Sequence, residues 1–126
     1  MRVLFADSFP RDIYRCFKDN RVIGTALDVG RVRGESLKTC PVQVFGETRE
    51  FLTGTVQIAL RCDAPIVQGF VVSRPNFYFR LVVTPPLHIP QEGDPPAEEI
   101  VPEVMQRYAD GIAAHVREHP DHLSRI

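Results

Sequence analysis

The four histidines are the side chains of this chain best suited to acid–base or metal chemistry: His88, His115, His119 and His122. His119 and His122 are three positions apart, a spacing that can place two metal ligands on one helix face. Pro120 lies between them, however, and a proline interrupts a helix. No third ligand is spaced nearby, and no histidine is followed five positions later by an acid. The sequence therefore predicts no metal site and no cofactor.

Asp28 is the acidic residue best placed for function. It stands near the end of Val22 to Val29 (VIGTALDV), an apolar run without helical period that predicts a buried strand. Ligands of open α/β sheets bind beyond the carboxyl ends of the strands, which favours a functional role for this carboxylate. The alternative is a residue that caps a loop or pairs with Arg31 or Arg33. The sequence alone leaves both interpretations open.

Other catalytic signatures are missing from the sequence. It contains no nucleophile elbow, no glycine-rich nucleotide loop and no HExxH motif. The three cysteines, Cys16, Cys40 and Cys62, are odd in number and far apart, so neither disulfides nor a redox motif are indicated. We expect reduced thiols in a cytoplasmic chain, with no signal peptide and no transmembrane segment.

The composition predicts a single soluble domain. The chain has 126 residues, of which 44% are hydrophobic and 25% charged, enough to bury a core without disulfides or metals. A net charge of -1 gives no reason to expect a nucleic-acid partner. We treat residues 1–126 as one domain.

The elements of the first half follow from apolar spacing and from capping residues. Ser8 and Pro10 predict the start of an amphipathic helix that ends at Asp19-Asn20. Residues 22–29 are the predicted buried strand, residues 30–41 a loop, and residues 42–45 a short edge strand. Thr53 is the predicted N-cap of a helix from Gly54 to about Asp63.

The second half predicts a hairpin, a linker and a helix. Residues 66–72 form an apolar strand, residues 73–76 a turn, and residues 77–83 alternate as a strand does, so we expect an antiparallel hairpin. Residues 85–97 are a proline-rich linker. Residues from about Glu98 to His119 carry one apolar stripe at helical spacing, with Pro102 expected in the first turn. The predicted fold class is α/β: a partial, mostly parallel open sheet with an antiparallel C-terminal hairpin and about three flanking helices.

The stretch from Arg11 to Pro86 resembles a known family. The run CPVQVFGETREFLTGTVQIALRCDAPIVQGFVVSR is similar to a pattern in the C-terminal half of the bacterial lipid A late acyltransferases, the lauroyl and myristoyl transferases of the lysophospholipid acyltransferase superfamily. The preceding KDNRVIGTALDVG resembles the family's helix, glycine, strand and acid unit, which places Asp28 on the recurrent acid. The other matching positions are Pro41, Phe45, Gly46, Gly54, Ala59, Ala64 and Pro65.

The chain also departs from the family's pattern, and these departures limit the activity that the resemblance implies. The family's His-x-x-x-x-acid motif, whose histidine removes the proton from the acceptor hydroxyl, belongs to an N-terminal half that has no counterpart here. The membrane-anchoring helix has no counterpart either, and Leu123 stands where the family favours tryptophan. We therefore expect no catalytic residue beyond Asp28 as a supporting acid, and a chain that is inactive on its own.

Three hypotheses follow. The first is an acyltransferase-like, non-catalytic domain that self-associates, binds a lipid or acyl-chain ligand, or binds a partner; an exposed sheet edge would favour a homo-oligomer. The second is a subunit of a lipid A acyltransferase that depends on acyl carrier protein and is completed by a partner chain carrying the N-terminal half, peripheral to the inner membrane. The third is an unrelated α/β binding protein.

Overall fold

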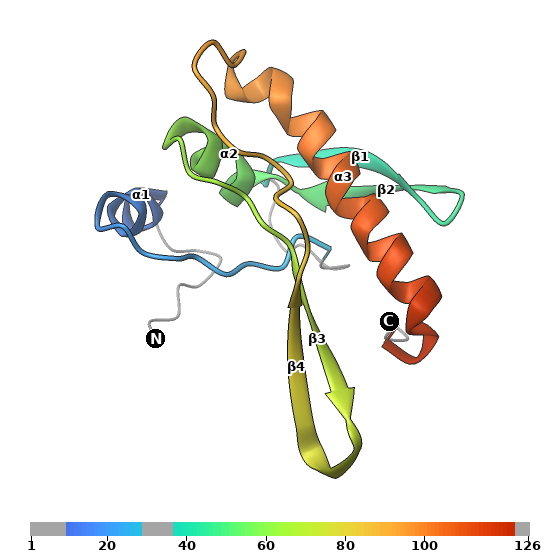
Figure 1. Ribbon diagram of the computed structural model, residues 1–126. Coiled ribbons are helices and arrows are strands. Elements are labelled where there is room, and N and C mark those ends of the chain that lie inside the picture. The colour runs from blue at the N-terminus through green and yellow to red at the C-terminus, as the bar shows by residue number, and fades with distance from the viewer. Residues whose placement is uncertain (1–9, 29–36, 123–126) are drawn as a thin grey trace.

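The computed structural model describes residues 10–28 and 37–122, which form a mixed α/β structure (Figure 1). Ser8, Arg31 and Arg33 lie outside these residues, so the roles expected of them are not described. The elements in order are α1 (Pro10–Lys18), β1 (Thr39–Val44), β2 (Glu47–Leu52), α2 (Gly54–Arg61), β3 (Gly69–Arg74), the short 3-10 helix η1 (Pro75–Phe77), β4 (Tyr78–Val83), α3 (Ala97–Glu118) and η2 (Pro120–His122).

The core lies between α3 and the β1–β2 hairpin. Successive residues of β1 alternate between exposed and buried, so Cys40, Val42 and Val44 point inward as the period of two requires. From α3, Val104 and Met105 are almost completely buried against them. The apolar stripe that predicted the last helix is therefore its core-facing side, and that prediction is confirmed. Pro102 lies in the second turn of this helix rather than the first.

A two-residue turn joins β1 to β2. Val44 pairs with Glu47, and both residues between them have positive φ, 53° at Phe45 and 77° at Gly46. This is the type I′ arrangement that fits the right-handed twist of a hairpin, and glycine adopts it without strain. The Phe-Gly pair of the family-like pattern is thus a backbone turn.

The residues flanking α2 also have backbone roles. Thr53 precedes the helix as predicted, but its hydroxyl donates to the Lys38 carbonyl oxygen at 3.2 Å and makes no capping bond. At the other end Asp63 has a φ of 50°, and the Ala64 amide donates to the carbonyl oxygen of Ala59 at 3.0 Å. The Asp63 amide also donates to the Leu60 carbonyl oxygen, at 3.3 Å. The two bonds close the last turn as in a Schellman motif.

The β3–β4 hairpin extends away from the rest of the molecule (Figure 1). Its strands pair without interruption from Gly69 opposite Val83 to Arg74 opposite Tyr78. The predicted antiparallel hairpin is therefore confirmed, although regular pairing begins at Gly69 and not at Ile66, which makes only an isolated bridge to His88.

The mostly parallel sheet is not found among the described residues. Both sheets there are two-stranded and antiparallel. The buried strand predicted at residues 22–29 was wrong for 22–28, which form no strand; Val22 is 98% exposed and only Leu27 is buried. The segment is held to β2 by a hydrogen bond from the Leu52 amide to the Leu27 carbonyl oxygen, 3.0 Å long. An apolar run indicates burial, but it does not supply a neighbouring strand with which to pair.

Strand β2 was missed by the sequence analysis. Its residues ETREFL are polar except at the end, and only Phe51 is buried. The strand is one edge of a two-stranded sheet and four of its six residues are exposed, so the apolar alternation is absent. The loop predicted for residues 30–41 was also too long, because Thr39 to Pro41 belong to β1. No helix of the described residues combines the length and the apolar character needed to cross a bilayer.

Candidate functional site

One face of the β3–β4 hairpin is apolar and exposed. Because directly opposed residues of an antiparallel pair point to the same face, Val71 with Leu81, Gly69 with Val83 and Ser73 with Phe79 share it. The large members are 57% to 69% exposed, namely Val71, Phe79, Leu81 and Val83. We call these four side chains the apolar face. Contiguous exposed apolar groups of this kind mark interaction sites more often than isolated ones do.

The opposite face of the hairpin meets helix α3 at one aromatic contact. The Phe70 ring stacks on the His115 ring with centroids 4.0 Å apart and planes within 6°. Phe70 pairs with Val82, so it belongs to the face that does not carry Leu81. Helix α3 therefore leaves the apolar face uncovered. Within the described residues, β4 pairs with β3 alone, so its outer edge is free.

The base of the hairpin is firmly attached to α3 and to its own second strand. Gln68 is 4% exposed, and its side-chain amide donates to the Tyr108 carbonyl oxygen at 3.0 Å. Its own carbonyl oxygen accepts from the Thr84 amide at 2.9 Å and from the Thr84 hydroxyl at 3.2 Å. These bonds fix where the hairpin leaves the body of the molecule, whereas its outer part makes few such contacts.

A groove lies between the hairpin, the β1–β2 hairpin and the C-terminal half of α3. Its volume is about 870 Å³, within the range of ligand pockets. Apolar side chains line part of it, including Phe45, Phe51 and Ile112, and polar groups such as Asp28 and Tyr108 line the rest. The groove is thus mixed in character, and Gly69, Val71 and Ser73 in its lining make it continuous with the β3 side of the apolar face.

Asp28 lies at this groove and accepts a hydrogen bond from the Tyr108 hydroxyl, 3.1 Å long. Burial of the phenol and then the neighbouring Asp28 carboxylate raise the pKa of Tyr108 to about 12. Tyr108 therefore stays protonated at neutral pH and acts as a hydrogen-bond donor. Asp28 thus lies at a groove, as a functional role would require, and its hydrogen bond with Tyr108 gives it a structural role as well.

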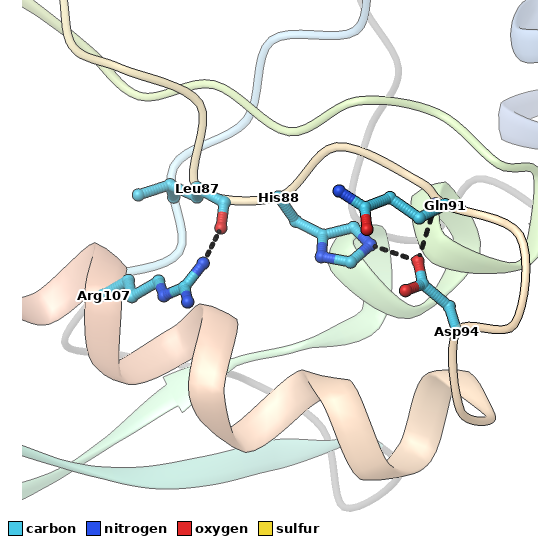
Figure 2. Close-up of polar contacts among 5 residues, drawn as sticks. All are labelled: Leu87, His88, Gln91, Asp94 and Arg107. Atoms are coloured by element: carbon cyan, nitrogen blue, oxygen red, sulfur yellow. Dashed lines mark hydrogen bonds and ion pairs between the residues drawn. The ribbon is translucent and has the colours of Figure 1, made fainter.

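A histidine and an acid do form a pair, at a spacing the sequence analysis did not consider (Figure 2). The Nε2 atom of His88 lies 3.1 Å from Oδ2 of Asp94, six positions later, and the same oxygen accepts from the Gln91 amide at 2.9 Å. Arg107 donates to the Leu87 carbonyl oxygen at 2.8 Å. An acid that orients an imidazole is half of a general-base arrangement.

The surroundings of His88 indicate that its pair with Asp94 has a structural role. Among the described residues, the lining of the cavity beside it, about 380 Å³ in volume, contains no serine, threonine, cysteine or tyrosine. Asp94 instead closes the proline-rich segment on itself, and the His88 backbone is held by its bridge to Ile66. No described residue lines both cavities, so the structure does not bring His88 and Asp28 together.

Three imidazoles gather at the end of α3. His115 Nε2 lies 3.0 Å from His122 Nδ1, and the ring centroids of His115, His119 and His122 are 4.8 to 5.1 Å apart. The sequence analysis missed His115 as a neighbour of the other two, because η2 folds the chain back beyond Pro120. Across residues 10–28 and 37–122, no three His, Cys, Asp or Glu side chains are arranged to hold a metal.

The family-matched positions do not form a site. They are spread over β1, the β1–β2 turn, and the interior and two ends of α2. Pro41, Gly54 and Pro65 are exposed, Ala64 is half-buried and Ala59 is buried. Phe45 and Gly46 belong to a turn, and Gly54, Ala64 and Pro65 lie at the ends of α2. A comparison of the chain with protein-family models, with curated proteins and with solved structures found no match.

Proposed function

We propose that this chain is an acyltransferase-like domain that is non-catalytic on its own and works by binding another protein chain through the β3–β4 hairpin. One observation carries the proposal: the hairpin presents Val71, Phe79, Leu81 and Val83 to solvent while both of its strands lack further partners among the described residues. A two-stranded hairpin is only marginally stable by itself in water. A bound chain would cover the apolar side chains and stabilise the hairpin.

The resemblance adds detail to this proposal. The mostly parallel open sheet that it implies would need further strands from another chain, in addition to the contact through the apolar face. The expected location is then the cytoplasm, peripheral to the inner membrane. A lipid or acyl chain is the ligand class that the resemblance implies, and the groove beside Asp28 is the place for it. If the chain is instead a subunit of an acyltransferase that is completed in trans, the partner chain carries the N-terminal half with the catalytic histidine.

The antiparallel pairing of both sheets favours a second candidate, an α/β binding protein unrelated to acyltransferases. That protein would use the same hairpin for the same purpose, because the exposed apolar face does not depend on ancestry. The two candidates differ in whether any acyl chemistry accompanies binding. Acyl transfer from acyl carrier protein, measured with the purified chain and with the chain in its native complex, separates them.

The binding proposal is tested by site-specific photo-crosslinking in the native host. A photoreactive phenylalanine analogue replaces Phe79 on the apolar face, and in a matched control it replaces Glu92, which is exposed on the loop before α3. We expect a cross-linked protein product from position 79 that is absent from position 92. No such product from position 79, or acyl transfer by the purified chain alone, overturns the proposal.

A further inference from the structure

We propose that the partner of the hairpin is a second copy of this chain, and that two hairpins pack face to face through Val71, Phe79, Leu81 and Val83 about a two-fold axis that runs along the strands. This inference rests on the proposed function and names its partner. It is carried by the order of large and small side chains on the apolar face.

The apolar face has one tall row and one low row. On β4 the row is Phe79, Leu81 and Val83, whereas on β3 the residues opposite them are smaller, in the order Ser73, Val71 and Gly69. At each of the three levels a larger side chain thus stands beside a smaller one. A Cβ built at Gly69 would lie 3.4 Å from Cδ1 of Leu81, an ordinary van der Waals distance, so the Leu81 side chain extends toward Gly69.

A two-fold axis parallel to the strands matches these rows. The rotation places β4 of one copy over β3 of the other and keeps each residue at its own level along the strand. Phe79 then meets Ser73 of the second copy, Leu81 meets Val71, and Val83 meets Gly69. Large side chains face small ones at every level, which is how the inner faces of two packed sheets interdigitate at about 10 Å separation. An axis across the strands would instead set tall row against tall row.

The charges and the neighbouring helix are compatible with this arrangement. The charged residues of the two strands, Arg74 and Arg80, pair with Tyr78 and Val72 and so lie on the opposite face. Like charges are therefore not brought together at the contact. Helix α3 contacts the hairpin through His115 and Phe70 on that opposite face. Beside Gly69, Val71 and Ser73 it leaves the groove of about 870 Å³, and β4 of the second copy would reach into that space.

The size of the contact predicts its strength. Four apolar side chains per copy make a smaller interface than the roughly 800 Å² per partner of a standard complex. We therefore expect a reversible dimer with a dissociation constant on the order of micromolar, not an obligate one. Sedimentation velocity of the full chain from about 1 to 200 µM, the range around such a constant, should show a monomer–dimer equilibrium.

Paired charge variants test the contact itself. Leu81→Lys should abolish the dimer, because the ammonium would be buried against Val71 of the other copy. Val82→Lys is the matched control: it makes the same change at the next residue of the same strand, but on the opposite face, and should leave the dimer intact. Val71→Glu should abolish the dimer in the same way as Leu81→Lys.

A mixture of the two disruptive variants should restore it. In a heterodimer of Leu81→Lys with Val71→Glu, one contact becomes a lysine–glutamate pair and the other remains Leu81 with Val71. Native mass spectrometry distinguishes this heterodimer by mass, and its recovery shows that both variants are folded. Restoration is not expected if Leu81 faces Leu81 of the second copy, or if the β4 edges pair.

The outcomes separate the two proposals. A wild-type chain that stays monomeric up to 200 µM, a dimer that survives Leu81→Lys, or a mixture that fails to form the heterodimer each overturns the face-to-face dimer. Cross-linking from position 79 to a protein of different mass would then identify another occupant and leave the proposed function standing. Absence of any cross-link at position 79 overturns the proposed function itself.

Discussion

At the residue scale, two side chains with shifted pKa values, Tyr108 and His115, are held by contacts that the sequence does not reveal. Tyr108 on α3 meets Asp28, and His115 near the end of α3 meets two other imidazoles and Phe70. Burial of these groups changes their pKa more than their charged neighbours do. Each contact can therefore be tested by titration without reference to any activity.

The first prediction concerns Asp28. Asp28→Asn should lower the pKa of Tyr108 from about 12, because it removes the carboxylate that disfavours the phenolate. The pKa should stay above the usual value of about 10, since burial of the ring remains. The absorbance of tyrosinate near 295 nm, followed against pH in a chain with Tyr14→Phe and Tyr78→Phe, measures it, because Tyr108 is then the one tyrosine left. Asp19→Asn, at the exposed end of α1, is the control and should leave the titration unchanged.

The second prediction concerns the pH dependence of stability. Burial, and then the charges of His119 and His122, lower the pKa of His115, against a smaller opposing effect of Glu118. The unfolded chain, with a histidine pKa near about 6.5, then binds more protons as the pH falls. The contribution of neutral His115 is thus present above about pH 6.5 and is lost as the pH falls through the lower folded pKa.

Thermal unfolding between pH 8 and pH 5 checks this sign. The wild-type midpoint should drop on acidification, and His115→Asn should drop less because it has no imidazole to protonate. Parallel curves for the two proteins would contradict the assignment of the effect to His115.

At the element scale, backbone geometry explains residues that could otherwise be taken for functional ones. Gly46 has a φ of 77° in the turn between β1 and β2, and a Cβ there would meet no atom within 4 Å. The need for glycine is therefore conformational and not a matter of space. Backbone conformation also explains the end of α2, where Asp63 takes the left-handed conformation that closes the helix.

The third prediction follows from that turn. Gly46→Ala should destabilise the fold by about 1 kcal/mol, the usual cost of placing a side chain in the left-handed region. Gly54→Ala is the control, because Gly54 is equally unhindered but has no positive φ at the start of α2. The control should be neutral or slightly stabilising, since alanine favours helices. Urea unfolding of both variants measures the difference, and equal losses would contradict the turn assignment.

At the scale of the whole molecule, stability and interaction reside in different parts. The core joins α3 to β1, β2 and α2, with Met105 fully buried at its centre. The β3–β4 hairpin lies outside that core and is anchored at its base by Gln68. A substitution in the core should therefore affect unfolding, and one in the apolar face should affect association.

The fourth prediction contrasts the two regions. Met105→Ala should lower the free energy of unfolding by about 2–5 kcal/mol, through lost burial and the cavity that it leaves. Phe79→Ala should cost much less in dilute solution, because Phe79 is 69% exposed. Chemical denaturation below 1 µM, where the proposed dimer is dissociated, compares them. A loss at Phe79 as large as that at Met105 would mean that the hairpin belongs to the core.

The sequence by itself determined the elements whose signals are local. The apolar stripe of α3, the alternation of β4 and the proline-rich segment before α3 each depend on residues close together in the chain, and the structure has them close to where they were predicted. The turn before β4 was predicted two residues too early, because Ser73 and Arg74 belong to β3. Helix α2 was likewise located by Thr53 and by its apolar spacing. Local periodicity suffices for such elements because side-chain direction follows from backbone geometry.

Only the tertiary structure decided which elements meet. The polar strand β2, the irregular segment around Leu27, the pairing of His88 with Asp94 and the gathering of His115 with His122 all depend on contacts between residues set apart by turns and loops. Exposed strands have little apolar alternation, and an apolar run does not say with what it packs. The apolar face is the same case: the order of its residues was readable, but that nothing in the described chain covers it is a property of the fold.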